Sequence, residues 1–269
     1  METGLRLLAV LAHPDDESLG IGATLAACAA AGIATHLVTA TRGERGWSGP
    51  PEEDPGLAAL GRIREGELRA AVEVLGVRSL ELLGYMDGDL DRAPPEEATG
   101  KIAMAVRRVR PQVVVTFDPF GAYGHPDHIA ISQFTTAAIP LAADAAAPGL
   151  AGLAPHRVDK LYYMALPQAL ADAYQAAFGA LRMPVDGAER GPVVWPEWAI
   201  TTRIATGDHW QTAWRAIQCH RSQLSEYARL EGLPEQHHQA LWGTQSYYRA
   251  LSLVNGGRAI ERDLFAGLR

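Results

Sequence analysis

Short apolar runs alternate with helical patterns through the first half of the chain, and this alternation narrows the choice of fold more than any other feature. Apolar or β-branched runs that are typical of buried strands occupy residues 5–12, 33–39, 80–83 and 113–117. Helical patterns occupy residues 18–31, 62–75, 96–109 and 127–139. Parallel strands joined by helical crossovers produce such an order. We therefore predict an α/β fold with a Rossmann-like, mostly parallel sheet flanked by helices.

The second half of the chain is less regular. Its strand patterns lie at residues 158–165, 198–205 and 247–253, a helical pattern lies at 208–223, and a helix followed by a Pro/Gly-rich loop is predicted within 167–196. The chain has 269 residues, 48% of them hydrophobic, which is enough to bury one sizeable core. We predict a single domain over residues 1–269 with an elaborated C-terminal half, in which residues 140–200 form an insertion that shapes a pocket.

Charge and cysteine content limit the partners of the protein. A formal charge of −7 disfavours nucleic acid and anionic membranes, because those partners reward clustered Lys and Arg. Arg107 and Arg108 form a basic cluster that suits the last turn of the predicted helix. The two cysteines, Cys28 and Cys219, cannot supply a disulfide framework or a cysteine-based zinc site. With no signal-peptide pattern and no apolar run of about 18 residues, we expect a cytoplasmic protein; a homo-oligomer is compatible with the sequence.

The first predicted strand ends in Ala-His-Pro-Asp-Asp-Glu at residues 12–17. Open α/β sheets bind ligands at the carboxyl ends of their strands, so these polar side chains stand where a site is expected. His13 and Asp16 lie three residues apart in a turn that enters a helix, and both can reach one metal ion; imidazole and carboxylate are ordinary zinc ligands. Asp15 lies between them and is placed to accept a proton from water on that metal. The alternative is that Asp15 and Asp16 only cap the helix.

A second His-Pro-Asp unit, within Gly-His-Pro-Asp-His at residues 124–128, follows the strand at 113–117. If the two strands are neighbours in the sheet, His128 completes a three-ligand site with His13 and Asp16. The fourth position then stays open for water, which distinguishes catalytic from structural zinc sites. The alternative is that one histidine of the second motif bonds a backbone carbonyl in the core while the other is exposed.

The two motifs resemble those of the LmbE-like (PIG-L) family of zinc-dependent N-deacetylases, which includes the mycothiol- and bacillithiol-pathway deacetylases of GlcNAc conjugates. The similarity extends to Thr-Arg-Gly-Glu-Arg-Gly at 41–46, to Arg64 and Glu67, and to Gly-Tyr-Met-Asp at 84–87. Cys-His-Arg-Ser-Gln at 219–223 is a weaker match. The resemblance covers the first half well and the second half loosely. The family fold is Rossmann-like, in agreement with the alternation of strands and helices.

The resemblance implies roles for the motif residues. By that similarity, His13, Asp16 and His128 would bind Zn²⁺, Asp15 would act as the general base, and His125 would stabilise the oxyanion. The implied reaction removes an N-acetyl group from a GlcNAc-type small molecule and gives acetate and a free amine. An amidase that cleaves thiol–sugar conjugates would share these motifs and differ only in its pocket.

Further positions match the family less directly. Tyr123 would help to polarise the carbonyl, and Asp127 would orient a histidine. Glu44, Arg64 and Asp87 match positions that line the sugar pocket.

Several of these residues have purely structural alternatives. Arg64 and Glu67 are also spaced to form an ion pair on the surface of a helix. Trp195 and Trp198 can stack on a sugar or pack in the core or in a lid. A non-enzymatic nucleotide-binding module is disfavoured, because Gly-Ile-Gly at 20–22 lies inside a predicted helix and not in a strand-to-helix turn.

Overall fold

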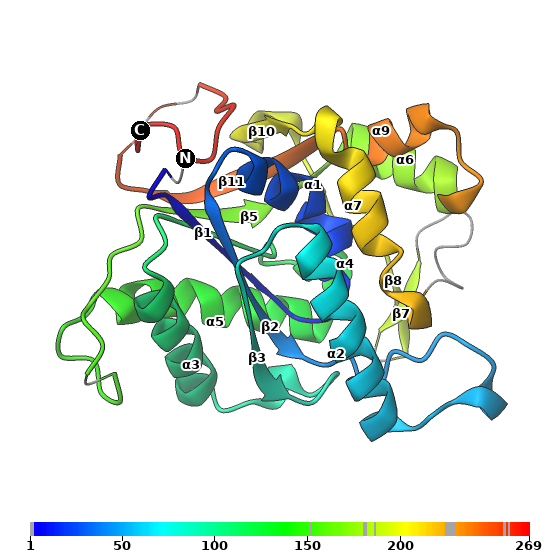
Figure 1. Ribbon diagram of the computed structural model, residues 1–269, viewed down its shortest axis with the longest axis horizontal. Coiled ribbons are helices and arrows are strands. Elements are labelled where there is room, and N and C mark those ends of the chain that lie inside the picture. Colours follow the sequence, from blue (N-terminus) through cyan, green and yellow to red (C-terminus); the bar gives the residue numbers. More distant parts are fainter. Residues whose placement is uncertain are drawn as a thin grey trace.

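A seven-stranded sheet runs through the centre of the protein, with its strands in the order β10-β11-β5-β4-β1-β2-β3 (Figure 1). The computed structural model describes residues 3–150, 152–179, 182–185, 187–223, 230–254, 257 and 259–269. The strands of the sheet are β1 Arg6–Leu11, β2 Ala34–Thr41, β3 Ser79–Tyr85, β4 Val113–Thr116, β5 Lys160–Met164, β10 Thr202–Ala205 and β11 Thr244–Ser252. Neighbours from β5 to β3 pair in parallel, and β11 pairs antiparallel with both β5 and β10. The predicted mostly parallel α/β sheet is confirmed.

The strand that carries the first motif lies directly beside the strand that carries the second. Leu7 of β1 is opposite Val113 of β4, and Ala9 is opposite Val115, in a parallel pairing. These side chains are fully buried, which explains why both strands read as continuous apolar runs. Because parallel strands end at the same edge of the sheet, the two His-Pro-Asp motifs meet there.

Helices cover both faces of the sheet. The helices α1 (Asp16–Ala30) and α2 (Leu57–Val74) lie on one face together with α7 (Trp210–Ile217), and α3 (Pro95–Val109) and α5 (Pro126–Ala143) lie on the other (Figure 1). Arg107 and Arg108 occupy the last turn of α3, as predicted. The Arg107 guanidinium turns inward to bond backbone carbonyls, among them those of Ala142 and Leu150 at 3.0 Å. The charge therefore also anchors the chain that follows α5.

Helix α2 begins five residues before the predicted start at residue 62. Gly61 interrupts the helical pattern in the sequence, yet its lack of a side chain has a use. A Cβ atom at this position would stand 2.9 Å from the Cγ of Glu44, so glycine lets α2 pack closely against the loop after β2.

The second half departs from two sequence predictions. The strand predicted at 198–205 begins only at Thr202, because a 3-10 turn, Glu197–Ala199, follows Pro196. The helix predicted at 208–223 is the shorter α7, followed by the 3-10 turn Arg221–Gln223. Other described elements of this half include β6 Leu166–Pro167, α6 Gln168–Phe178, the β7–β8 hairpin (Met183–Val185 and Ala188–Arg190), β9 Val194–Trp195, the 3-10 turn Gly207–His209 and α9 Glu235–Trp242. The C-terminal half is thus assembled from short elements, with a second apolar cluster around Trp210 and Trp242.

Both cysteines are free, and Cys28 is buried. Across the described part of the chain, we find no helix long and apolar enough to cross a membrane.

Candidate metal centre and active site

The turn after β1 folds back on the end of its own strand. The Oδ2 atom of Asp16 accepts hydrogen bonds from the backbone N–H groups of Ala12 (3.1 Å) and His13 (2.7 Å). Asp15 adopts a left-handed conformation, with φ at 101°. The Asp15 carboxylate thus bonds Arg64, and the Asp16 carboxylate bonds the backbone at the end of β1. These contacts argue against the alternative that the two carboxylates only cap the helix.

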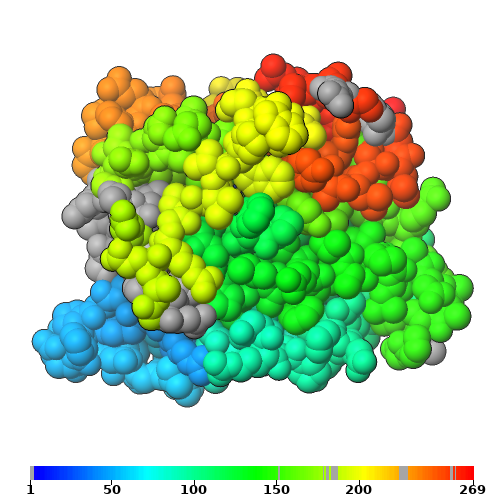
Figure 2. Space-filling model, turned by 180° about the vertical axis from the view of Figure 1, so that it is seen from behind, coloured from blue at the N-terminus to red at the C-terminus, as the bar shows by residue number. Residues whose placement is uncertain are grey.

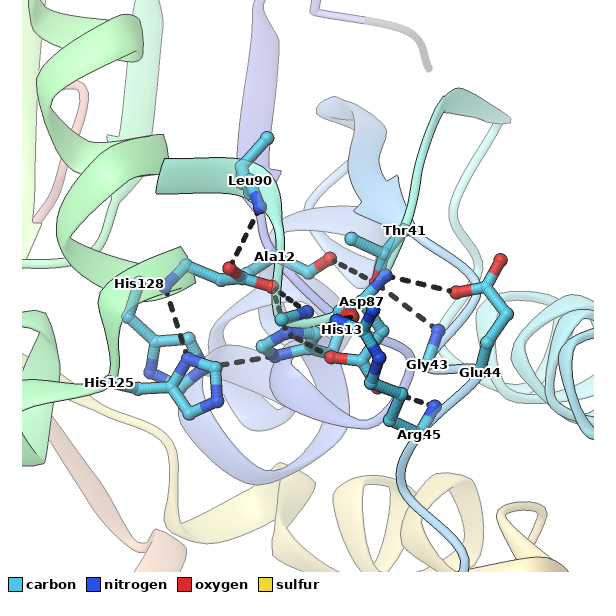
Figure 3. Close-up of polar contacts among 12 residues, drawn as sticks. Ala12, His13, Thr41, Gly43, Glu44, Arg45, Asp87, Leu90, His125 and His128 are labelled. Carbon is cyan, nitrogen blue, oxygen red and sulfur yellow. Dashed lines mark hydrogen bonds and ion pairs between the residues drawn. The ribbon is translucent and has the colours of Figure 1, made fainter. Parts of the chain in front are cut away.

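Three residues that could bind a metal, His13, His128 and Asp16, converge where β1 and β4 end. Figure 3 shows the two histidines side by side. The Nδ1 atom of His13 lies 3.1 Å from the Nε2 atom of His128. Asp16 places Oδ1 at 3.6 Å from that Nε2 atom and Oδ2 at 3.8 Å from the Nδ1 atom of His13. Ligand atoms around a tetrahedral zinc stand about 3.3 Å apart, given bonds of about 2.0–2.1 Å. The two nitrogens stand close to that spacing, and Asp16 presents a different oxygen to each of them, so the three residues have the chemistry to hold such an ion.

The ring of His128 is fixed from one side by an aromatic neighbour. It stacks on Phe117 with ring centroids 3.9 Å apart and an interplanar angle of 12°. Its Nδ1 atom is buried and, among the described residues, has no hydrogen-bond partner. The stacking fixes the plane of the His128 ring, and in that plane its Nε2 atom faces His13.

His125 also lies close enough to form a ligand set with His13 and His128. It begins α5 as the N-cap residue, and its Nδ1 atom accepts a hydrogen bond of 3.2 Å from the backbone N–H of Asp127. The Nδ1 atom is thereby occupied, and the Nε2 atom of the neutral ring carries the proton. We therefore favour Asp16 over His125 as the third ligand.

Two carboxylates hold the opposite side of the His13 ring. The Nε2 atom of His13 lies 3.0 Å from Asp127 Oδ2 and 3.1 Å from Asp87 Oδ1. Asp127 is itself held by the backbone N–H groups of Gly88 (2.7 Å) and Leu90 (3.1 Å) (Figure 3). The histidine whose ring contacts the Asp127 carboxylate is thus His13. A proton on Nε2 leaves the Nδ1 lone pair for a metal, as carboxylates commonly arrange for ligand histidines.

Burial and mutual contacts shift the pKa values of the clustered histidine and aspartate side chains far from their usual values. Burial lowers the pKa of His13, but hydrogen bonds to Asp127 and Asp87 outweigh it and raise that pKa to about 10. Burial raises the pKa of Asp16 to about 7, and burial beside His13 holds the pKa of His128 well below its usual value. Because metal ligands must be deprotonated, a divalent cation bound by these groups would displace their protons.

A buried arginine holds Asp15. Arg64, on α2, donates from Nη2 to Asp15 Oδ2 (3.1 Å) and to the carbonyl of Pro14 (2.6 Å), and from Nη1 to the carbonyl of Gly43 (3.0 Å). The side chain of Arg64 is only 4% exposed. The alternative of an ion pair between Arg64 and Glu67 on the helix surface is therefore wrong. Glu67 instead accepts hydrogen bonds from the backbone N–H (2.8 Å) and the hydroxyl (2.7 Å) of Ser222.

The loop before the second motif places Tyr123 beside two histidine rings. Its ring lies edge-on to His128 (5.3 Å between centroids) and to His125 (6.0 Å). Ala122 has a positive φ of 62°, which is uncommon for a residue with a side chain and recurs at functional sites. Tyr123 is therefore near enough to act beside His125.

Of the residues matched to the sugar pocket, Glu44 and Asp87 lie in the loops after β2 and β3, and Arg64 lies on α2. Glu44 Oε2 accepts from the backbone N–H of Asp87 at 3.3 Å, and Asp87 Oδ2 accepts from that of Arg45 at 3.0 Å. Glu44, Arg64 and Asp87 are all buried, and they bond other protein groups. A role for these three in substrate binding stays a prediction.

Segments from the second half border the site. Trp195 donates from Nε1 to Asp118 Oδ2 (2.7 Å), the N–H of Val193 donates to the carbonyl of Ala122 (2.7 Å), and Arg190 donates to that of Gly124 (2.5 Å). Figure 2 shows this yellow-green segment on the surface beside the green first-half elements. A cavity of about 490 Å³, outside the histidine cluster, lies between α6 and this segment. The Trp198 residue is 87% exposed, so the alternative that it packs in the core is wrong.

Sequence reasoning gave no role to one buried pair. Glu17, the last residue of the first motif, bonds the Nε2 atom of His220 through Oε1 at 2.8 Å, and both side chains are fully buried. Burial raises and the charge of His220 lowers the pKa of Glu17, with a net decrease, whereas Glu17 raises the pKa of His220 against burial. The weak match at 219–223 was the available signal, but no spacing in the sequence links it to residue 17.

Comparison with known proteins identifies the family of this chain. The model of the PIG-L family, described as GlcNAc-PI de-N-acetylase, matches residues 8–139. A 1D-myo-inositol 2-acetamido-2-deoxy-alpha-D-glucopyranoside deacetylase from Kineococcus radiotolerans is 37% identical, over 98% of this chain and 83% of its own length. The protein of the same name from Streptomyces avermitilis is 36% identical, over 98% of this chain and 97% of its own.

Solved structures share the fold. A conserved protein from Thermus thermophilus superposes with a TM-score of 0.65 at 29% identity, covering 94% of this chain and 97% of its own. The N,N'-diacetylchitobiose deacetylase from Pyrococcus horikoshii superposes with a TM-score of 0.66 at 18% identity, covering 91% of this chain and 83% of its own. The chain therefore belongs to the PIG-L family of de-N-acetylases, and it is a hydrolase of amide bonds.

Proposed function

We propose that this protein is a zinc-dependent N-deacetylase that converts a small GlcNAc glycoside and water into acetate and the free amine. The observation that carries the proposal is the convergence of His13, His128 and Asp16 next to Asp15: the ring nitrogens lie 3.1 Å apart, and the two oxygens of Asp16 lie 3.6 Å from His128 and 3.8 Å from His13. Relatives at 36–37% identity over 98% of the chain, named as deacetylases of a GlcNAc–inositol glycoside, support the substrate class.

The proposed ligands are His13 Nδ1, Asp16 Oδ1 and His128 Nε2. Imidazole and carboxylate together suit zinc, and three protein ligands leave a position open for water or substrate. A zinc ion held there would supply Lewis-acid polarisation of the acetamide carbonyl and would lower the pKa of water to about 7.

Asp15 is the proposed general base. Its carboxylate takes a proton from the attacking water while the water oxygen bonds to the acetyl carbon. The same carboxylate then passes the proton to the amine nitrogen as the C–N bond breaks, so that acetate and amine leave. Arg64, buried against Asp15, orients the carboxylate by donating to its Oδ2 atom.

His125 is the proposed oxyanion donor. Because its Nδ1 atom accepts from the Asp127 backbone, Nε2–H of the neutral ring is the group that can donate to the carbonyl oxygen as charge develops. One such donor is typically worth about 3 kcal/mol in the transition state. Tyr123, whose ring lies edge-on to His125, is the proposed second donor to that oxygen.

The pocket for the remainder of the substrate is proposed to lie over the loops after β2 and β3 and the 140–200 region. Glu44, Arg64 and Asp87 are the proposed contacts to the sugar. The docking of Arg190 on the carbonyl of Gly124 supports a role for the 140–200 region in shaping the pocket.

Acetate release and metal content test the proposal together. We expect about one zinc per chain, and acetate and amine in equal amounts from the GlcNAc–inositol glycoside, with slower release from free GlcNAc and N,N'-diacetylchitobiose. Chelation should stop the reaction, and added zinc should restore it. A protein that binds no metal and releases no acetate from any of these would contradict the proposal. Faster cleavage of a thiol–sugar conjugate would favour the amidase alternative.

A further inference from the structure

The backbone of Asp15 is held in an unfavourable conformation. Its φ of 101° lies in the region that side-chain-bearing residues seldom adopt, so surrounding contacts must maintain it. The backbone carbonyl of Asp15 accepts from the N–H groups of Ser18 (3.0 Å) and Leu19 (2.9 Å) as α1 begins. Its N–H donates to the Oε2 atom of Glu17 at 3.0 Å. Glu17 thus closes a tight loop around the proposed base.

The other oxygen of Glu17 is bound from the far end of the chain. Oε1 accepts from the hydroxyl of Ser18 and lies 2.8 Å from the Nε2 atom of His220, 203 positions away. Both Glu17 and His220 have no exposed side-chain surface. A buried carboxylate without partners would turn toward another donor or take up a proton, so His220 fixes where Glu17 points.

His220 is in turn fixed by the segment around it. Its backbone N–H bonds the carbonyl of Ile217 at the end of α7 (3.0 Å). Two residues later, Ser222 bonds Glu67 on α2, and the Gln223 amide donates to the carbonyl of Gly46 at 2.6 Å. The histidine is therefore anchored against the same loop and helix that hold Arg64 and Asp15.

We infer that Glu17 and His220 are positioning residues for Asp15: His220 orients the Glu17 carboxylate, which holds the left-handed Asp15 backbone and so aims the base. This inference rests on the proposed role of Asp15. Neither residue would touch the substrate, so their effect should appear in turnover, while substrate affinity and zinc content stay the same.

The main test compares two substitutions of His220 with a matched substitution of another buried histidine. His220→Ala should lower kcat about 10- to 100-fold, because small misplacements of a catalytic group cost this much. KM and zinc content should not change, and His220→Gln, which keeps a donor, should recover most of the rate. His238, 4% exposed beside Trp210 and Trp242, provides the control: His238→Ala should lower Tm and leave kcat unchanged.

A double-substitution cycle shows whether His220 acts through Asp15. In an Asp15→Asn background, His220→Ala should cause no further loss of the residual rate. Equal losses in the two backgrounds, or an unchanged kcat in His220→Ala alone, would overturn the inference.

Hydrogen exchange separates this inference from the proposed function, since it requires no substrate. The peptide that contains Asp15 should exchange faster in His220→Ala than in the wild type or His238→Ala. If the wild type releases no acetate, the proposed function fails while the exchange result still decides the positioning role. If the wild type is fully active but the Asp15 peptide exchanges at the same rate in His220→Ala, the positioning role of His220 is refuted while the proposed function stands.

Discussion

The two halves of the chain contribute differently to one site. The first half, up to the end of α5, provides every proposed metal ligand, the proposed base and the proposed oxyanion donors, all close to the ends of β1 and β4. The second half provides partners that lie behind or beside those groups, such as His220 against Glu17 and Trp195 against Asp118. The proposed reactive groups belong to short motifs in the first half, whereas the residues that hold them in place lie far from them in the sequence.

This division predicts which property each substitution should change. First-half substitutions at the site should alter metal binding or turnover with little effect on stability. Second-half substitutions should alter stability or geometry without removing the metal.

Asp15→Ala should lower kcat roughly 100- to 10,000-fold, the usual contribution of a general base, while one zinc per chain remains. Metal analysis and steady-state acetate release measure both properties on one sample. Asp15→Asn, which keeps a partner for Arg64, controls for lost packing and should be equally impaired. Normal turnover in Asp15→Ala would show that Asp15, and with it the first half of the chain, does not provide the general base.

Glu261→Ala should lower the free energy of unfolding by roughly 3–5 kcal/mol, because it leaves the buried Lys160 ammonium unpaired. Glu261 bonds Lys160 Nζ (2.8 Å), Tyr162 Oη (2.6 Å) and Thr202 Oγ1 (3.0 Å). Denaturant unfolding measures the loss, and zinc content should not change. Glu189→Ala, which breaks an exposed ion pair, should leave stability unaltered. Zinc loss in Glu261→Ala would show that the halves are not separable.

Asp87→Ala should weaken zinc binding about 10- to 100-fold, the usual cost of removing a carboxylate behind a ligand histidine. Asp127 remains to hold His13, so binding should not vanish. Chelator competition measures the affinity, with Asp89→Ala, which breaks the exposed ion pair to Arg45, as the control. A raised KM at saturating zinc would support the proposed contact between Asp87 and the sugar. An unchanged zinc affinity would contradict the role of Asp87 behind His13.

Trp195→Phe should cause the smallest change, a loss of about 1.5 kcal/mol in unfolding free energy, because one hydrogen bond to the buried Asp118 disappears. KM should rise slightly as the loop before His125 loosens, and zinc content should stay constant. Thermal unfolding and kinetics measure these effects. Trp198→Phe, at an 87% exposed position, should be neutral. A large fall in kcat for Trp195→Phe would give the second half a direct share in the chemistry.

Most of the parallel sheet could be predicted, and the reason lies in its strands. The central strands β1 and β4 are buried on both faces and need apolar runs, which stand out in a sequence. The second half lacks this regularity: Pro196 is followed by a 3-10 turn where a strand was predicted, and α7 ends at Ile217, well before residue 223. Short elements that depend on packing against other parts of the chain leave weak periodic signals.

The two motifs, their placement after strands and the chemical types of the ligands can be read from the amino-acid sequence, because strand periodicity and motif chemistry are local. The neighbouring positions of β1 and β4, the contact of Asp127 with His13 and that of Arg64 with Asp15 became known from the folded structure. It alone also brought His220 to Glu17, across 203 positions. Such contacts depend on how strands and helices pack, and that packing is set by burial summed over the whole chain.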